Sequence, residues 1–272
     1  MPYLSAAALR ELEAKLGGRD WQVIERVSGL HFASANQLAR LCFDGDRRAA
    51  RRSLLRLTRL LVLDRLPRRV GGVGFGSADF AYHLGRAGLR LAILRGWQPE
   101  RRRRRSVVPG TLFLRHTLLI AELHAQLVEA DRSQSIELLE LESEPACWRA
   151  YSGGHGQRQT LKPDSYARLG AGEYEDSFFV EIDNGTEGSR TIARQLARYL
   201  HYYRSGTEQR ERGVFPKTLW LAVRPERVRA IGDCVQALPG AGRELFAAAR
   251  FEDAVAVMSG QDRASPDFTQ MI

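Results

Sequence analysis

A run of five arginines at residues 101–105 divides the chain. Prolines flank the run at Pro99 and Pro109, so neither a regular helix nor a central strand is expected to continue through it. Residues 1–105 carry 22 Lys+Arg against 9 Asp+Glu, whereas residues 106–272 carry 19 against 23. We therefore expect a basic domain over residues 1–98, a basic linker over 99–110 and an acidic domain over 111–272. The linker is either a solvated hinge or a segment that contacts DNA phosphates.

The composition indicates a globular protein of the cytoplasm. A chain of 272 residues can bury two independent cores, and it contains no apolar run near the roughly 20 residues that span a bilayer. Its first segment is amphipathic and partly acidic, unlike a secretion signal. The three cysteines form no CxxC pair, which argues against a zinc ribbon and a disulfide framework.

Three short helices are expected within residues 20–63. Asp20, Ser34 and Asp46 each precede apolar residues at helical spacing, so each is predicted to cap a helix N-terminus. Helices with such tight joints are typical of a helix-turn-helix. Two strand-like runs around the glycine-rich residues 71–76 follow directly, and they predict the wing of a winged helix-turn-helix.

The third helix, expected over residues 47–63, separates arginines from apolar residues. On a helical wheel Arg48, Arg52, Arg56 and Arg59 fall within about 80° of one another. The apolar residues Ala50, Leu54, Leu57 and Leu61 fall on the other side. Such a helix fits the major groove of double-stranded DNA, where arginine binds phosphates or guanine. A solvated basic face is the alternative, since an arginine bias also accompanies a G+C-rich genome. The predicted DNA-binding residues are Arg47, Arg48, Arg51, Arg52, Arg56 and Arg59 on the helix, and Arg65, Arg68 and Arg69 on the first strand of the wing.

From Thr111 the pattern changes to that of an α/β domain. A long amphipathic helix is followed by strand-like runs, by a helix from about Ser189 to a residue before Gly206, and by further strands. Asp164 is expected on one strand, with Glu181 and Asp183 on one face of the next. Clustered carboxylates repel unless a cation joins them, so the trio predicts a magnesium or manganese site. The alternative is that Asp164 caps a turn and the other two acids face solvent on an edge strand.

These motifs resemble those of a known family. Pro163-Asp164, then Glu181-Ile182-Asp183 and a helix, resemble the PD-(D/E)xK nuclease superfamily over about residues 112–224. With the winged-helix pattern in front, "PDSYARL", "FFVEIDNGTEG" and "QLARYLHYY" resemble the replication-relaxation family of bacterial plasmids and mobile elements over nearly the whole chain. The resemblance implies a winged helix joined to a mixed-sheet α/β domain of the nuclease type.

The superfamily mechanism implied by this resemblance is metal-assisted phosphodiester hydrolysis. Two acids hold the ion, and a lysine two residues after the second acid assists the attacking water. In this chain Asp183 occupies that lysine position, and Gln195 occupies the helix position where the family pattern often has a lysine. Lys162 and Arg194 are the available substitutes, but a guanidinium cannot serve as a base. If the domain is active, the catalytic residues are Asp164, Glu181, Asp183 and Lys162 with magnesium or manganese. Without cutting, such an ion can still bind at Asp164, Glu181 and Asp183.

Two functions follow as hypotheses. The first is a DNA-binding protein of a plasmid or mobile element, acting in replication, mobilisation or transcriptional control, with a degenerate nuclease-like domain. The second is a metal-dependent endonuclease targeted by its winged helix. A tyrosine relaxase is disfavoured because the chain has no His-x-His pair, and Tyr199, Tyr202 and Tyr203 are expected to pack. Glu122 is either a fourth carboxylate of the site or solvated. A homodimer on paired half-sites is possible, although no heptads support it.

Overall fold

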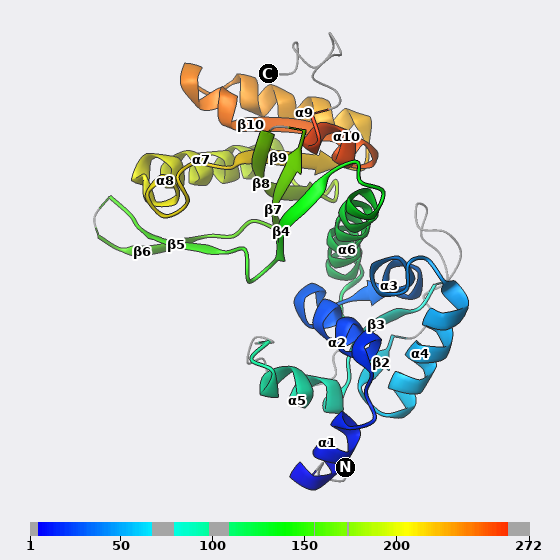
Figure 1. The fold of residues 1–272 in the computed structure, drawn as a ribbon. Coiled ribbons are helices and arrows are strands. Elements are labelled where there is room, and N and C mark those ends of the chain that lie inside the picture. Colours follow the sequence, from blue (N-terminus) through cyan, green and yellow to red (C-terminus); the bar gives the residue numbers. More distant parts are fainter. Residues whose placement is uncertain (1–4, 67–78, 98–108, 155, 173, 261–272) are drawn as a thin grey trace. The chain divides into compact units, whose positions relative to one another are not determined.

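The computed structural model describes residues 5–66, 79–97, 109–154, 156–172 and 174–260 (Figure 1). The chain forms two compact units, Met1–Ala125 and Gln126–Ile272, and the division falls inside a long helix. The mixed α/β class predicted from the sequence is confirmed: helices accompany one mixed five-stranded sheet and smaller antiparallel sheets. The expected linker lies almost wholly in residues 98–108, which are outside the described part of the chain.

The first unit contains helices around a small antiparallel sheet of order β1-β3-β2. Ala33 pairs with Tyr82, and Leu63 pairs with Leu84, so β3 is the central strand. In chain order the elements are α1 (Ala6–Glu13), α2 (Gly18–Leu30), β1 (Ala33–Ser34), α3 (Ala35–Cys42), α4 (Arg47–Arg59), β2 (Leu63–Arg65), β3 (Ala81–Leu84), α5 (Arg86–Leu94) and the start of α6 (Thr111–Arg132).

Local capping explains where these helices begin. Ser34 caps α3 by accepting from Gln37 N, and Asp46 caps α4 by accepting from Arg48 N and Ala49 N, as predicted. The prediction for Asp20 was wrong. Because α2 begins at Gly18, Asp20 lies in its first turn and accepts from Gly17 N at 2.8 Å.

Helix α4 is also shorter than predicted. It ends at Arg59 rather than continuing to residue 63, because Leu61 adopts a left-handed backbone with φ of 60° and Leu63 already belongs to β2. Leu61, expected among the buried leucines, is consequently 38% exposed.

Polar contacts attach α6 to α3 within the first unit. Gln37 Nε2 donates to Leu118 O at 2.9 Å and to Glu122 Oε2 at 3.1 Å, and Arg40 Nη1 lies 2.5 Å from Glu122 Oε1. Both carboxylate oxygens of Glu122 thus have partners on α3, so Glu122 is not simply solvated. It neutralises Arg40 and holds two helices together.

The second unit is built on a five-stranded sheet of order β10-β9-β8-β7-β4. The first pairings, β4 with β7 and β7 with β8, are antiparallel, whereas β9 and β10 run parallel to β8. Its strands are β4 (Glu137–Ser143), β7 (Ser165–Ala171), β8 (Tyr174–Asp183), β9 (Lys217–Ala222) and β10 (Phe246–Arg250), and a separate hairpin, β5 (Arg149–Ser152) with β6 (Arg158–Leu161), was not predicted.

Apolar residues of α7 and α9 form one core with this sheet. Phe179, Trp220 and Phe246 of the strands share a buried cluster with Ile192 and Leu196 of α7. The helices here are α7 (Ser189–Ser205), α8 (Thr207–Arg212), α9 (Pro225–Gln236) and α10 (Ala254–Met258), with 3-10 turns at Gly240–Leu245 and Phe251–Asp253. The limits predicted for α7 are confirmed; Gly206, with φ of 65°, ends the helix.

Two of the three tyrosines at the end of α7 are buried in this core, as predicted. Tyr199 is 2% exposed and Tyr202 fully buried, while Tyr203 is 41% exposed with its ring 5.2 Å from that of Phe215. Burial raises the pKa of both Tyr199 and Tyr202 above the usual range, so both phenols keep their protons. A buried, protonated phenol is unsuited to nucleophilic attack on DNA.

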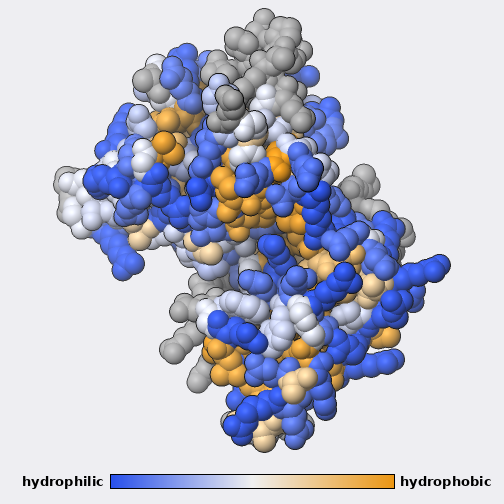
Figure 2. All heavy atoms as spheres, in the orientation of Figure 1, coloured by the Kyte–Doolittle hydropathy of each residue, from blue (hydrophilic) through white to orange (hydrophobic). Residues whose placement is uncertain are grey.

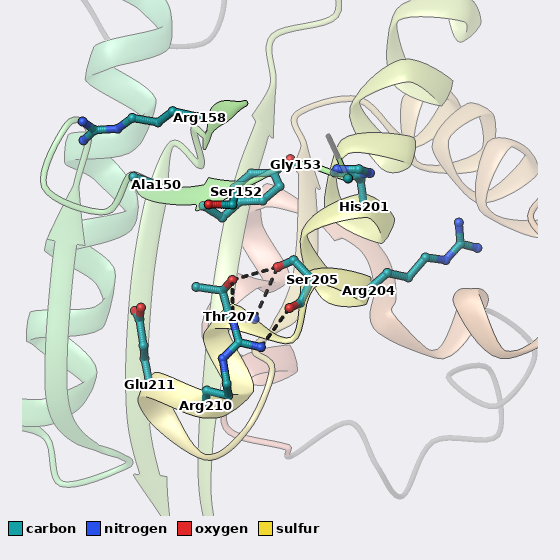
Figure 3. Close-up of a pocket in the computed structure, with 12 residues that line it drawn as sticks. Ala150, Ser152, Gly153, Arg158, His201, Arg204, Ser205, Thr207, Arg210 and Glu211 are labelled. Atoms are coloured by element: carbon teal, nitrogen blue, oxygen red, sulfur yellow. Dashed lines mark hydrogen bonds between the residues drawn. The ribbon is translucent and has the colours of Figure 1, made fainter. Parts of the chain in front are cut away.

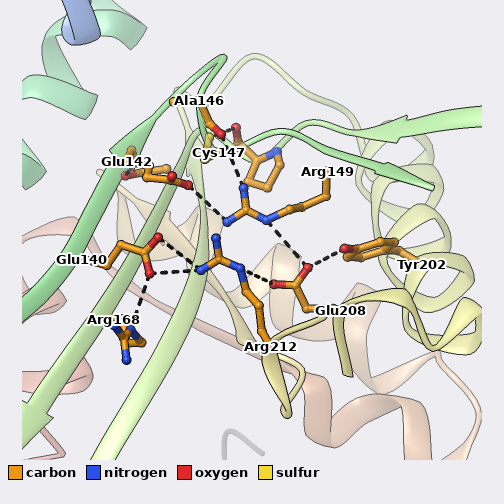
Figure 4. A network of polar contacts seen from close by, with 11 residues as sticks. Glu140, Glu142, Ala146, Cys147, Arg149, Arg168, Tyr202, Glu208 and Arg212 are labelled. Atoms are coloured by element: carbon orange, nitrogen blue, oxygen red, sulfur yellow. Dashed lines mark hydrogen bonds and ion pairs between the residues drawn. The ribbon is translucent and has the colours of Figure 1, made fainter. Parts of the chain in front are cut away.

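A buried polar network fixes α8 to the sheet (Figure 4). The fully buried carboxylate of Glu208 accepts a hydrogen bond from Tyr202 and lies 3.7 Å from both Arg149 Nε and Arg212 Nε. These guanidiniums continue to acids of β4: Arg149 Nη2 to Glu142 Oε2 at 3.1 Å, and Arg212 Nη1 to Glu140 Oε2 at 3.0 Å. Each buried charge therefore has partners of opposite sign, as interior charges require.

In the described part of the chain, no helix combines the length and apolar character that a bilayer span needs. On the face shown in Figure 2, hydrophilic side chains project from the region of α4.

Two helical glycines should respond oppositely to replacement by alanine. In Gly88→Ala the added Cβ would overlap the carbonyl oxygen of Val62, so we expect a loss of about 1–3 kcal/mol in the free energy of unfolding. Gly232 in α9 has open space around it, so Gly232→Ala should stabilise by up to about 1 kcal/mol. Urea unfolding monitored by circular dichroism measures both. Equal effects of the two changes would contradict the packing of α5 on the turn before β2.

Candidate functional site

Asp164 lies directly before β7 and bonds to residues near the C-terminal end of β8. Its backbone N donates to Val180 O at 3.1 Å, and its Oδ2 accepts from Ile182 N at 2.7 Å. The carboxylate thus takes the place of a backbone acceptor where the β7 ladder begins. This position brings Asp164 close to Glu181, which lies between the two β8 residues that it contacts.

Glu181 is buried on the side of β8 that faces α7. It is 8% exposed, and its Oε1 accepts from the Tyr199 hydroxyl at 2.5 Å. Burial, followed by the negative charge of Asp164, raises the pKa of Glu181 well above its usual range, although the Tyr199 hydrogen bond opposes the rise. Glu181 therefore retains its proton at pH values at which exposed glutamates are already deprotonated.

Asp183 forms a bidentate ion pair with an arginine of α9. Arg227 Nε lies 2.7 Å from Asp183 Oδ2, and Arg227 Nη2 lies 3.0 Å from Asp183 Oδ1. The second nitrogen also donates to Glu187 O at 2.8 Å. The Asp183 side chain is fully buried, and its hydrogen bonds raise the pKa of Arg227. The position where the nuclease pattern has lysine thus holds an acid, and a guanidinium from another helix neutralises it.

The three acids as arranged do not fit a divalent cation. Both oxygens of Asp183 accept from Arg227, Glu181 accepts from Tyr199, and Asp164 accepts from a backbone N–H. No group of three or more His, Cys, Asp or Glu side chains in the described residues is placed to hold a metal ion. Metal binding would require these bonds to be exchanged, and carboxylate oxygens that bind Mg²⁺ or Mn²⁺ must be deprotonated.

The proposed substitutes for the missing lysine are occupied elsewhere. Lys162 Nζ lies 4.4 Å from the centroid of the Trp148 ring, and the exposed Arg194 donates to Thr191 Oγ1 at 3.3 Å. Gln195 does turn toward the site, where its Nε2 donates to Glu187 Oε1 at 3.4 Å. Its buried Oε1 has no hydrogen-bond partner in the described residues. An amide therefore occupies the helix position at which the resemblance led us to look for a lysine.

Sequence reasoning missed Arg227. The only available signal was indirect: an acid on the inward face of a strand needs a partner of opposite charge. Nothing in the local sequence distinguishes Arg227 from Arg224 or Arg229, because only the packing of α9 brings one of them to Asp183.

The second set of predicted residues lies on α4. Ala50, Leu54 and Leu57 are buried, whereas the arginines of the helix are exposed, so the predicted separation of its faces is present. In the described part of the chain, no ion pair or side-chain hydrogen bond occupies five of these guanidiniums, those of Arg47, Arg48, Arg51, Arg52 and Arg59.

Two further arginines of this set have partners, and two cannot be described. Arg56 Nη2 lies 2.5 Å from Asp20 Oδ2, so its side chain ties α4 to α2. Arg65 lies over the Phe80 ring, 3.9 Å from its centroid. Arg68 and Arg69 fall within residues 67–78, outside the described residues.

Comparison with known proteins gives one match. The sequence model of a family described as "Replication-relaxation" matches residues 25–218. The matched range extends from α2 to β9 and contains both α4 and the three acids. No curated protein and no solved structure gives a significant match to the chain.

Glu181 should make the stability of the second unit depend on pH. The folded state keeps the Glu181 proton above the ordinary pKa of 4.5 at which the unfolded chain releases it. The stabilisation is therefore complete below that pH and is lost as the pH rises toward the folded-state pKa, by up to about 1.4 kcal/mol per pH unit. Glu181→Gln, which keeps an acceptor for Tyr199, should become progressively more stable than wild type as the pH rises above 4.5 toward the folded-state pKa of Glu181.

Thermal unfolding at several pH values, with a chelator present, measures this difference. Glu226→Gln is the matched control, because its side chain is 60% exposed. A constant difference between wild type and Glu181→Gln would show that the proton is not held in the fold.

Proposed function

Since the chain belongs to the replication-relaxation family, we propose that it binds double-stranded DNA of a plasmid or other mobile element and acts in its replication, mobilisation or transcriptional control. The observation that carries the proposal is the exposed side of α4. Five guanidiniums there form no ion pair or side-chain hydrogen bond with the residues that the structure describes, and the opposite side of the helix is buried. Unpaired arginines on a rigid helix are suited to phosphates and guanine edges.

The order of elements supports a winged helix-turn-helix as the DNA-binding part. Helix α2, strand β1, helices α3 and α4, and strands β2 and β3 follow one another along the chain, with the three strands in one antiparallel sheet. In such a domain the last helix enters the major groove and the hairpin contacts the adjacent backbone. We assign these roles to α4 and to the hairpin of β2 and β3.

For the second unit we propose a nuclease-like domain that no longer cuts DNA. The succession α6, β4, β7, β8, α7 and β9 supports a PD-(D/E)xK-like core, with Asp164 and Glu181 at the motif positions. The bonds of Asp183 to Arg227 and the amide of Gln195 support the loss of catalysis. The alternative is a metal-dependent endonuclease, which the closeness of Asp164 to Glu181 favours.

Replacing one unpaired arginine of α4 should weaken DNA binding. If Arg52 contacts a base, Arg52→Ala should weaken the free energy of DNA binding by about 1–3 kcal/mol. If Arg52 contacts a phosphate, the slope of log K against log salt should fall in magnitude by about 1. Arg56→Ala should also lower the stability of the first unit, because it leaves the 7%-exposed side chain of Asp20 without its ion pair. Fluorescence anisotropy with duplex DNA measures the affinities.

Arg10→Ala is the control for Arg52→Ala. It removes the same charge from an exposed position of α1 in the same unit. Equal affinities of Arg52→Ala, Arg48→Ala and Arg10→Ala would contradict the assignment of α4 as the DNA-contacting helix.

A supercoiled plasmid separates the two candidate activities. With Mg²⁺ or Mn²⁺ the wild-type protein should leave the plasmid supercoiled on an agarose gel, because the lysine position is occupied by Asp183 and neutralised by Arg227. Nicking that disappears in both Asp164→Ala and Glu181→Ala would instead establish the endonuclease. Nicking that persists in both variants would point to a contaminating enzyme.

A further inference from the structure

The exposed side of α7 is cationic although the rest of its unit is not. At 100° per residue Arg190, Arg194, Arg198, His201 and Arg204 fall within about 120° of one another, and all five are exposed. Helix α7 contains no Asp or Glu, whereas residues 106–272 as a whole carry 19 Lys+Arg against 23 Asp+Glu. We call these five residues the α7 stripe.

The arginines of the stripe differ from others in the same unit. In the part of the chain that the structure describes, none of the four forms an ion pair, and only Arg194 has a side-chain hydrogen bond, to Thr191. Arginines elsewhere in the unit are paired with acids, as in Arg149–Glu142, Arg168–Glu175, Arg212–Glu140, Arg224–Glu226, Arg227–Asp183 and Arg250–Asp253. Six guanidiniums of the unit are thus neutralised by acids, whereas in the described residues those of the stripe form no ion pair, and neither do those of Arg158, Arg210, Arg229 and Arg243.

A polar groove adjoins the C-terminal end of the stripe (Figure 3). Its volume is about 850 Å³, and it lies between the β5–β6 hairpin and the turn from α7 to α8. His201 and Arg204 of the stripe line it, and Arg158 of β6 stands on the other side. The charge of Arg198 also reaches the groove, because it acts on Tyr151 in the groove wall.

Hydrogen-bond donors lie inside the groove. Ser152 and Thr207 contribute hydroxyls, whereas the Ser205 hydroxyl already donates to Tyr202 O at 2.6 Å. Arg210 is held in place by bonds to Ser205 O at 3.0 Å and Thr207 Oγ1 at 3.2 Å. Glu211 is the one acidic side chain among the lining residues. Hydroxyls and oriented guanidiniums around a polar groove favour an anionic oxygen-rich ligand over an apolar one.

We propose that the α7 stripe and this groove form a second phosphodiester-binding surface, which follows the backbone of a nucleic-acid strand. The stripe advances about 6 Å with each four residues of helix, so successive guanidiniums can meet a row of phosphates rather than one isolated anion. The inference rests on the proposed DNA partner but not on α4. It assigns the second unit a direct role in holding DNA without any cutting.

The test uses the full-length double variant Arg198→Ala/Arg204→Ala. Binding to a 30-bp duplex, and to one of its strands alone, is measured in EDTA at several salt concentrations, with the length chosen to cover about three helical turns. The slope of log K against log salt should decrease by about 1 for each arginine that contacts a phosphate. A decrease on the duplex assigns the stripe to duplex DNA, and a decrease on the single strand alone assigns it to an unpaired strand.

Two variants serve as controls. Arg224→Ala/Arg250→Ala removes the same charge from guanidiniums that acids already neutralise, so it should leave both slopes unchanged. Arg198→Lys/Arg204→Lys keeps the cations and should retain most of the slope. Polyglutamate is added as a competitor. If the surface binds acidic proteins, polyglutamate should compete for it as strongly as DNA does.

The outcomes separate this inference from the proposed function. If Arg198→Ala/Arg204→Ala binds both DNAs like wild type while Arg52→Ala binds weakly, the second surface is refuted and the role of α4 stands. If the stripe variant alone loses affinity, the role of α4 fails and the stripe stands. Equal competition by polyglutamate and DNA at equal charge would also overturn the inference.

Discussion

The ion pair of Asp183 with Arg227 is the interaction on which the second unit depends. A carboxylate without solvent contact at the end of the central strand β8 is tolerated only with a partner of opposite charge, and breaking such a pair costs about 3–5 kcal/mol. Because Arg227 also donates to Glu187 O, one guanidinium connects β8, the segment before α7, and α9. The same contact neutralises the position where a nuclease of this pattern would have its lysine. The stability of this unit and the proposed loss of catalysis thus rest on the same pair of residues.

Charges in this protein fall into two classes. Those inside the second unit are paired, as the bonds of Glu208 with Tyr202, Arg149 and Arg212 illustrate. The guanidiniums on α4 have no such partners in the described residues, apart from that of Arg56. An unpaired arginine at the surface costs little free energy because water solvates it. When such arginines bind a polyanion, the release of its counterions favours the complex. This difference is the physical basis for assigning DNA contact to surfaces and structural roles to the buried acids.

Local rules predicted the parts of the fold that local interactions determine. Ser34 and Asp46 were identified as caps because a short polar side chain before an apolar helix has few other roles, and Gly206 marked the end of α7. The partner of Asp183, the β5–β6 hairpin and the ion pair of Arg56 with Asp20 were not predictable. Each depends on segments far apart in the sequence, and the charge pattern indicated only that partners were needed. The closeness of Asp164 to Glu181 was expected, but their bonds to Ile182 and Tyr199 were not.

We propose that this chain holds DNA through arginines and needs no metal ion to do so. The most direct measurement is the affinity for duplex DNA across a range of salt concentrations, made once in EDTA and once in Mg²⁺. We expect binding in EDTA, with log K falling linearly as log salt rises and a slope that corresponds to several phosphate contacts. Absence of binding in EDTA, with binding restored by Mg²⁺, would contradict it and return the acids Asp164 and Glu181 to the centre of the function.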